Sequence, residues 1–122
     1  MPEAASPNSQ SRQTMQLSTT IGADGTIVLT LGGDIDVATS GDVLAAGLGV
    51  LGSRHCSTLC LDLAGVTFLD STGIGALVSL RNAAGDYGRT LVLRDPSPAT
   101  TRLLQLTGLS DVFDLARPIA SA

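Results

Sequence analysis

Residues 58–80, TLCLDLAGVTFLDSTGIGALVSL, decide the fold because a strand pattern here runs directly into a helix pattern. Residues 58–63 form a short, nearly continuous apolar run, which is typical of a central strand in a parallel sheet. Residues 66–69 then carry the chain to Asp70, where the apolar spacing becomes that of a helix running to about Ala84. This succession indicates an α/β domain.

The chain before this stretch predicts a hairpin of two strands. Residues 15–20 and 26–31 carry β-branched and apolar residues, and a turn at residues 22–25 separates them. That spacing favours antiparallel pairing. The glycine pair at residues 32–33 is expected to end the second strand, so residues 34–36, Asp-Ile-Asp, are expected to form a loop.

Helix and strand signals alternate through the rest of the chain. A helix is expected from about residue 40 to 51, where apolar residues recur at helical spacing, and residues 90–94 are the fourth strand candidate. Ser97 followed by Pro98 predicts a third helix, because serine caps helices and proline suits the first helical position. Gly108 is expected to end that helix in a left-handed conformation.

The predicted order is β-β-α-β-α-β-α, followed by a short apolar element within residues 109–115. This order predicts a single α/β domain with a mixed, mostly parallel sheet of four to five strands and helices packed on it. The domain is expected over residues 14–118. Residues 1–13 are polar and are expected to form a disordered tail, and residues 119–122 a short C-terminal tail.

Composition and charge narrow the classes of function. The 122 residues are 43% hydrophobic and only 15% charged, which excludes a wholly disordered chain. Seven arginines and no lysine stand against eleven acidic residues, for a net charge of −4. A protein that binds DNA or RNA directly normally carries the opposite sign, so direct nucleic-acid binding is not expected.

The apolar runs indicate where the protein resides, and the cysteine content indicates whether its thiols are oxidised. The longest near-apolar run, residues 43–52, is about half of the roughly 20 residues that a membrane-spanning helix needs. Residues 1–13 lack the basic and apolar regions of a secretory signal, so a cytoplasmic protein without a membrane segment is expected. Cys56 and Cys60 are expected to be free thiols, with Cys56 the more exposed and any redox role left open.

Two polar segments are predicted to meet at one edge of the sheet. A crossover helix joins the second and third strands, so their carboxyl ends lie at the same edge, where open α/β sheets bind ligands. The first segment carries Asp34 and Asp36, and the second reads Asp-Ser-Thr-Gly over residues 70–73 at the start of a helix. The free backbone N–H groups there predict an anion site, with weak phosphate or nucleotide binding left open.

Structural roles compete with functional ones at these positions. Ser71 and the aspartates near it also fit ordinary helix-capping and turn roles. Gly73 and Gly75 are costly inside a helix, by up to about 1 kcal/mol each relative to alanine. Either tight packing on the sheet or the close approach of a partner explains them.

Three blocks of the sequence resemble one protein family. Residues 61–77, LDLAGVTFLDSTGIGAL, resemble the signature of the STAS domain of bacterial anti-sigma-factor antagonists. Residues 32–40, GGDIDVATS, resemble that family's second motif, which often has Glu where this chain has Asp34. Residues 103–115, LLQLTGLSDVFDL, resemble its C-terminal motif. The blocks stand in the family's order, and together they are a specific signal.

The resemblance implies a STAS-like fold and transcription regulation by partner switching, as in stress responses. In that family an anti-sigma factor, itself a serine kinase, phosphorylates the serine after the motif aspartate, which here is Ser71. The unphosphorylated domain binds the anti-sigma factor and releases the sigma factor, and a protein serine phosphatase resets it. A monomer or weak dimer is expected, and the partner-binding residues are expected to be Asp34, Asp36, Thr39, Asp70, Ser71, Thr72, Gly73 and Gly75.

Other functions are less favoured. The sequence around Ser71 is not the G-x-S-x-G turn of a hydrolase, and His55 precedes the third strand, at the opposite end from Ser71, so neither catalysis nor a cofactor is expected. His55, Cys56 and Cys60 are too few ligands for a closed zinc site, so no metal is expected. The alternative left open is a STAS regulatory subunit of a lipid transporter or of a stress-sensing assembly.

Overall fold

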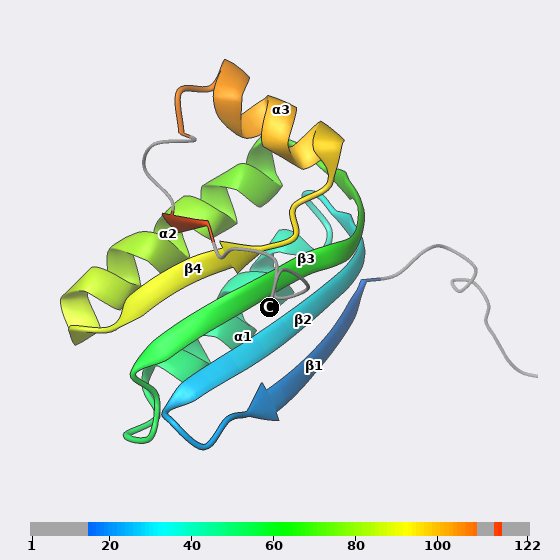
Figure 1. Ribbon diagram of the computed structural model, residues 1–122. Coiled ribbons are helices and arrows are strands. Elements are labelled where there is room, and N and C mark those ends of the chain that lie inside the picture. The colour runs from blue at the N-terminus through cyan, green and yellow to red at the C-terminus, as the bar shows by residue number, and fades with distance from the viewer. Residues whose placement is uncertain (1–14, 110–113, 116–122) are drawn as a thin grey trace, which may run out of the picture.

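Figure 1 presents the fold as a computed structural model, which describes residues 15–109 and 114–115. The strands are β1 (Gln16–Ile21), β2 (Thr26–Ile35), β3 (Thr58–Leu69), β4 (Thr90–Arg94) and β5 (Asp114–Leu115). The helices are α1 (Ser40–Leu51), α2 (Ser71–Tyr87) and α3 (Pro98–Leu106). The predicted tails at residues 1–13 and 119–122, and most of the predicted apolar element at 109–115, lie outside the described residues.

The strands form one sheet in the order β1-β2-β3-β4-β5. β1 is antiparallel to β2, and the other three pairings are parallel. α1 and α2 lie side by side on one face of the sheet, and α3 lies near the carboxyl end of β3 (Figure 1). The predicted α/β class, with its mixed and mostly parallel sheet, is confirmed.

The core is a ladder of aliphatic side chains that faces α1 and α2. Ile27 pairs with Leu59, which pairs in turn with Leu91, and the next inward row repeats this with leucines at all three positions. All of these side chains are buried. Because burying one Leu or Ile contributes about 1.5–3 kcal/mol, this ladder fixes the register in which the parallel strands meet.

β2 and β3 are longer than the sequence predicted. The expectation that residues 32–33 end the second strand is wrong, because β2 continues to Ile35 and places Asp34 inside the strand. The register against β3 shifts twice in this region, so the glycines accommodate bulges rather than a strand end. Gly33 adopts a φ of +87°, and a Cβ on Gly65 would approach the Leu31 carbonyl oxygen to 3.2 Å.

α1 and α2 pack closely at a glycine. A Cβ on Gly47 would lie 2.5 Å from Leu80 Cδ2, so with any larger residue here the buried side chain of Leu80 would have to move. α2 extends three residues past the predicted end and stops at Gly88, whose φ is +70°. α3 begins as predicted, with Ser97 Oγ accepting a hydrogen bond from the Thr100 N–H at 3.1 Å.

Both cysteines lie in the interior of the described domain. Cys60 is buried on β3, and Cys56, expected to be the more exposed, is also buried. The short loop before β3 turns Cys56 inward onto the aliphatic core instead of leaving it at the surface. Burial raises the pKa of both thiols, which disfavours the reactive thiolate.

Candidate functional site

The ends of β2 and β3 come together where the sequence predicted a site. Ile35, the last residue of β2, pairs with Leu69, the last residue of β3. Just beyond this pair, the Asp70 N–H donates a hydrogen bond of 3.3 Å to the Ile35 carbonyl oxygen. The two polar segments are therefore adjacent, and residues 34–39 and 70–75 are called the serine edge below.

Asp70 caps α2 and occupies the helix N-terminus. Its Oδ1 accepts hydrogen bonds from the Thr72 N–H at 2.9 Å, the Gly73 N–H at 3.1 Å and the Thr72 hydroxyl at 2.6 Å. The Thr72 hydroxyl, followed by the backbone N–H donors, holds the pKa of this carboxyl below its ordinary value. The predicted anion site of free N–H groups is therefore wrong for these donors, since the side chain of Asp70 already binds them.

Ser71 and Thr72 are adjacent hydroxyls in different states. Both side chains are exposed in the first turn of α2. The Thr72 hydroxyl is held by Asp70, whereas no described residue forms a hydrogen bond with the Ser71 hydroxyl. Ser71 consequently presents an accessible oxygen that the fold does not use.

Asp34, Asp36 and Thr39 form a compact turn at the end of β2. The Thr39 hydroxyl donates to the Asp34 carbonyl oxygen at 2.8 Å and accepts from the Asp36 N–H at 3.0 Å. Asp36 Oδ1 accepts from the Ala38 N–H at 3.0 Å, and Asp34 Oδ1 accepts from the Thr67 hydroxyl of β3 at 2.8 Å. These three residues have structural roles, and each side chain remains partly exposed.

The two glycines of α2 differ in what surrounds them. A Cβ on Gly73 would lie 2.6 Å from Leu69 Cδ1 and 2.8 Å from the Ile35 carbonyl oxygen, so packing of the helix on the sheet requires this glycine. A Cβ on Gly75 would meet no atom within 4 Å. Packing within the domain explains Gly73 and leaves Gly75 unexplained.

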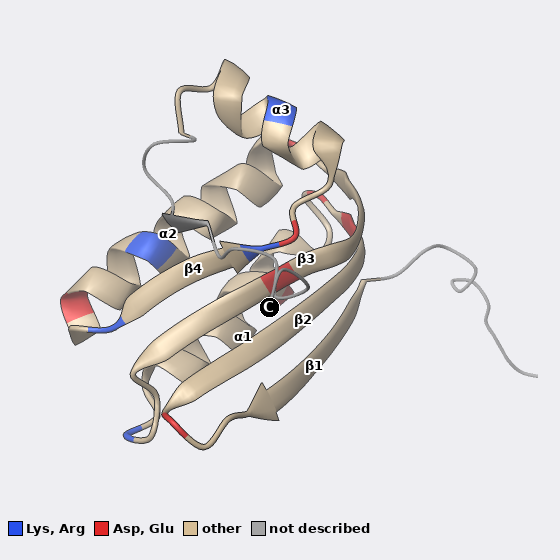
Figure 2. Ribbon diagram, viewed as in Figure 1, with Lys and Arg blue, Asp and Glu red and all other residues tan. Residues whose placement is uncertain are grey.

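Each of the three central parallel strands ends directly before an aspartate. Asp36 follows β2, Asp70 follows β3 and Asp95 follows β4. Figure 2 shows acidic segments at this end of the sheet. The nearby Arg94 is paired with Asp62 at 2.9 Å. The serine edge is therefore rich in carboxylates.

Sequence reasoning missed an apolar groove beside the serine edge. A hollow of about 270 Å³ lies between the end of β3 and α3, with Phe68 and Leu69 on one wall and Leu103 and Leu106 on the other. The signal available in the sequence was the run VTFL at residues 66–69, in which the bulged register turns an aromatic residue outward. Thr67, whose hydroxyl donates a hydrogen bond to Asp34, was missed because its position also depends on this bulged register.

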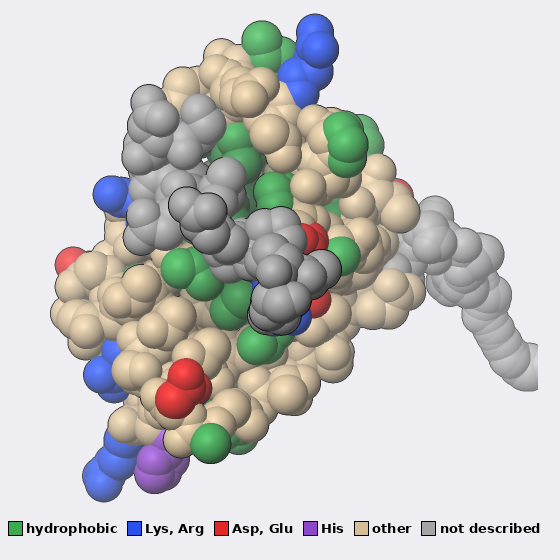
Figure 3. All heavy atoms as spheres, viewed as in Figure 1, with side chains coloured by type: hydrophobic (Ala, Val, Ile, Leu, Met, Phe, Trp, Pro, Cys, Tyr) green, Lys and Arg blue, Asp and Glu red, His purple; other side chains and the backbone are tan. Residues whose placement is uncertain are grey.

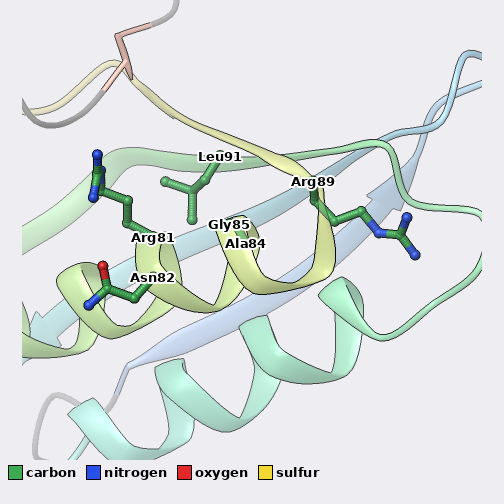
Figure 4. A pocket seen from close by; sticks show the side chains of 6 residues that line it. All are labelled: Arg81, Asn82, Ala84, Gly85, Arg89 and Leu91. Carbon is green, nitrogen blue, oxygen red and sulfur yellow. The ribbon is translucent and has the colours of Figure 1, made fainter.

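A second hollow, of about 300 Å³, lies between α2 and β4 and is lined by Arg81, Asn82 and Leu91 among others (Figure 4). Arg89 also belongs to its lining, but its side chain turns away from Arg81 in Figure 4. Its guanidinium donates to the backbone carbonyl oxygens of Leu51 and Ser53. Arg89 thus ties α2 to the end of α1.

The hydrolase and metal alternatives find no support in the geometry. His55 precedes β3 and Ser71 follows it, so the twelve residues of the strand separate them by roughly 40 Å. Asp62, the carboxylate that a triad with Ser71 and His55 would use, is bound to Arg94 rather than to His55. Among the side chains that the structure describes, no three of His, Cys, Asp or Glu gather in a way that could hold a metal ion.

Among the described residues, no helix combines the length and the apolar character that crossing a bilayer demands.

Comparisons with known proteins agree with this architecture. A protein-family model described as Mlab, STAS domain, matches residues 18–116. An anti-sigma-B factor antagonist of Listeria monocytogenes is 35% identical over 83 residues, which make up 68% of this chain and 72% of the relative. A crystal structure of an anti-sigma factor antagonist from Mycobacterium paratuberculosis is 28% identical, with a TM-score of 0.71, and the match covers 88% of this chain and 90% of that one.

The fold also matches SpoIIAA, an anti-sigma factor antagonist solved in its unphosphorylated form, with a TM-score of 0.71. The two chains are 19% identical, and the match covers 87% of this chain and 92% of SpoIIAA. Bacillus SpoIIAA has also been solved in its phosphorylated form, which this chain matches with a TM-score of 0.66. The chain therefore belongs to the STAS domain family, together with these anti-sigma factor antagonists.

Proposed function

We propose that this protein is an anti-sigma-factor antagonist that is switched off by phosphorylation of Ser71. Without phosphate, the serine edge binds a cognate anti-sigma factor, which then releases its sigma factor. The anti-sigma factor is itself a serine kinase that phosphorylates Ser71 in the cytoplasm, and a protein serine phosphatase restores the binding form. Relatives named as antagonists at 33–35% identity support the role of the family.

The observation that carries the proposal is the state of the Ser71 hydroxyl. A kinase must reach its acceptor oxygen, and Ser71 is exposed with no hydrogen-bond partner among the described residues. The neighbouring Thr72 would first have to give up its 2.6 Å bond to Asp70 and disturb the cap of α2. This difference favours Ser71 over Thr72 as the phosphoacceptor.

Electrostatics explains why phosphate would end binding. A phosphoserine carries nearly two negative charges at pH 7, and this one would sit beside the carboxylate of Asp70. At a separation of about 8 Å, each carboxylate opposes the phosphate by roughly 1–4 kcal/mol before salt screening. The helix N-terminus offsets about 0.3–2 kcal/mol at most, and Asp70 already binds its N–H donors at positions 72 and 73.

The free-energy cost of the phosphate becomes larger when a partner covers Ser71. A dianion buried in an interface without basic partners loses its hydration, which costs several kcal/mol more. A net loss of about 3–4 kcal/mol weakens binding a few hundred-fold. The switch therefore needs no refolding of the domain.

Gly75 supports a close contact on this side of α2. It lies one helical turn after Ser71, on the same face, and nothing within the domain fills the space beside it. Without a Cβ, a glycine at such a position lets another surface approach the helix backbone closely. We therefore include Gly75 in the docking surface and assign Gly73 to packing.

Intact mass after a kinase reaction tests the assignment. The protein is incubated with ATP and, one at a time, with the purified anti-sigma factor kinases of its source organism. A gain of roughly 80 Da that persists in Thr72→Ser and disappears in Ser71→Ala is expected. A gain that survives in Ser71→Ala, or no gain with any of these kinases, contradicts the proposal.

The second candidate function is a STAS regulatory subunit of a larger assembly, such as a lipid transporter. The observation in its favour is that the matching family model takes its name from Mlab and not from an antagonist. Affinity purification from the source organism separates the two. Recovery of a small serine kinase supports the antagonist, and recovery of a transporter ATPase supports the subunit.

A further inference from the structure

The groove between β3 and α3 exposes apolar side chains that the fold does not need at its surface. Phe68 is 52% exposed on the β3 side, and Leu106 is 73% exposed on the α3 side. Figure 3 shows hydrophobic side chains at the surface on and beneath α3. A hollow of about 270 Å³ with such walls accepts one large apolar side chain.

The groove is acidic on its β3 side, whereas α3 carries the exposed Arg102 next to Leu103 (Figure 2). Asp34 is bound to Thr67, which lines the groove, and Asp34 also lies opposite Phe68 in the register of β2 and β3. Asp70 directly follows Leu69, another lining residue. An occupant whose apolar side chain is flanked by basic residues complements the carboxylates of Asp34 and Asp70 on the β3 side, whereas an acidic segment on that side is repelled.

The groove is also continuous with the serine edge. The chain passes from Leu69 on its wall to Ser71 in two residues, so one partner segment can cover both. A phosphate on Ser71 would then add negative charge beside Asp34 and Asp70 on the β3 side of the groove. Position and charge together point to the partner that Ser71 controls.

We infer that the groove between β3 and α3 anchors an aliphatic or aromatic side chain of the anti-sigma factor, carried on a segment with flanking Lys or Arg. The inference rests on the proposed function and adds the chemistry of its partner. Seating the side chain against Phe68 and Leu106 removes their apolar surface from water, which holds the complex together. The basic flanking residues orient the partner segment against the carboxylates and exclude partners without such charges.

Matched variants at equal exposure test the groove. The anti-sigma factor that phosphorylates Ser71 is titrated calorimetrically, without ATP, into the wild type, Phe68→Ser and Leu106→Ser. The controls lie outside the groove: Tyr87→Ser, because Tyr87 is 49% exposed, and Ile21→Ser, because Ile21 is 71% exposed. Thermal melts by circular dichroism confirm that each variant folds.

The groove variants are expected to bind at least tenfold more weakly, with both controls within about twofold of the wild type. Wild-type affinity is expected to fall with added salt, and Asp34→Asn is expected to make it less sensitive to salt.

Groove variants that bind as the controls do, while phosphorylation of Ser71 still abolishes binding, overturn the groove and leave the proposed function intact. Absence of wild-type binding overturns both. A dimer of this chain that Leu106→Ser dissociates assigns the groove to a second copy and overturns the inference.

Discussion

The backbone N–H of Asp70 donates a hydrogen bond of 3.3 Å to the carbonyl oxygen of Ile35. This bond ties the first cap residue of α2 to the last residue of β2, two segments that are far apart in the sequence. The Asp36 turn and the Ser71 hydroxyl are therefore held at one edge by the backbone. A charge gained at Ser71 must act on carboxylates that cannot easily move away.

Replacing the cap of α2 should destabilise the domain. Asp70→Ala removes the acceptor for the N–H groups of Thr72 and Gly73 and should lower the free energy of unfolding by about 0.5–2 kcal/mol. Asp70→Asn keeps an oxygen acceptor and should cost less. Urea denaturation followed by circular dichroism measures both, and equal stability of Asp70→Ala and the wild type would falsify the capping role.

The two glycines at the start of α2 should respond in opposite directions to alanine. Gly73→Ala forces a Cβ against Leu69 and the backbone of Ile35 and should cost about 1–3 kcal/mol of unfolding free energy. Gly75→Ala adds a Cβ in open space and should gain up to about 1 kcal/mol. Urea midpoints of the two variants decide this, and a loss of stability in Gly75→Ala would show that the domain itself needs that glycine.

Gly75→Ala should also show that the stability of the domain and its affinity for the anti-sigma factor can change in opposite directions. If the partner approaches the backbone of α2 at Gly75, the more stable variant should bind the anti-sigma factor more weakly. Gly85→Ala is the matched control, because Gly85 is an exposed glycine of the same helix with open space beside it. Calorimetric titration gives both affinities, and equal weakening by the two variants argues against a specific contact at Gly75.

A similar contrast is expected between two glycines of α1. Gly47→Ala places a Cβ within 2.5–2.7 Å of both terminal methyl carbons of Leu80, so the buried Leu80 side chain must repack or the helices must move apart, which should cost about 1–3 kcal/mol of unfolding free energy. Gly49→Ala meets no atom within 4 Å and should be neutral or stabilising. Thermal melts compare the pair, with Gly49→Ala as the control for helix propensity.

Acid should weaken the domain through Asp70 and Asp62. Hydrogen bonds from Thr72 lower the pKa of Asp70, and those from Ala64 and Arg94 lower the pKa of Asp62 despite the opposing effect of its burial. A carboxyl whose pKa is lower in the folded state contributes stability above its unfolded value, 3.8 here, and loses that contribution as pH falls through the folded pKa. Urea midpoints at neutral pH and below about pH 4 should differ less when both are changed to Asn than in the wild type.

The sequence predicted that the segments around Asp36 and Ser71 meet at one edge of the sheet, but not how each segment is built. The strand-helix succession at residues 58–80 and the crossover through α1 place Asp36 and Ser71 at one edge, because parallel strands share their direction. The extension of β2 past residues 32–33 was not predictable from local signals, since a glycine pair marks a strand end and a bulge equally well. Its meaning depends on pairing with β3, which is a long-range property.

Other features depended on side-chain positions that a single sequence does not fix. Asp70 was recognised as a capping residue, but only the structure shows that it occupies the N–H groups expected to receive an anion. The same holds for Cys56, whose burial depends on how the loop before β3 folds back onto the core. The outward position of Phe68 follows from the second register shift between β2 and β3.

The most direct test of the switch compares two forms of one protein. The domain is phosphorylated stoichiometrically on Ser71, and its affinity for the anti-sigma factor is measured by calorimetry beside that of the unmodified domain. The electrostatic account predicts binding a few hundred-fold weaker for the phosphorylated form, with an unchanged circular dichroism spectrum. Equal affinity of the two forms would contradict it.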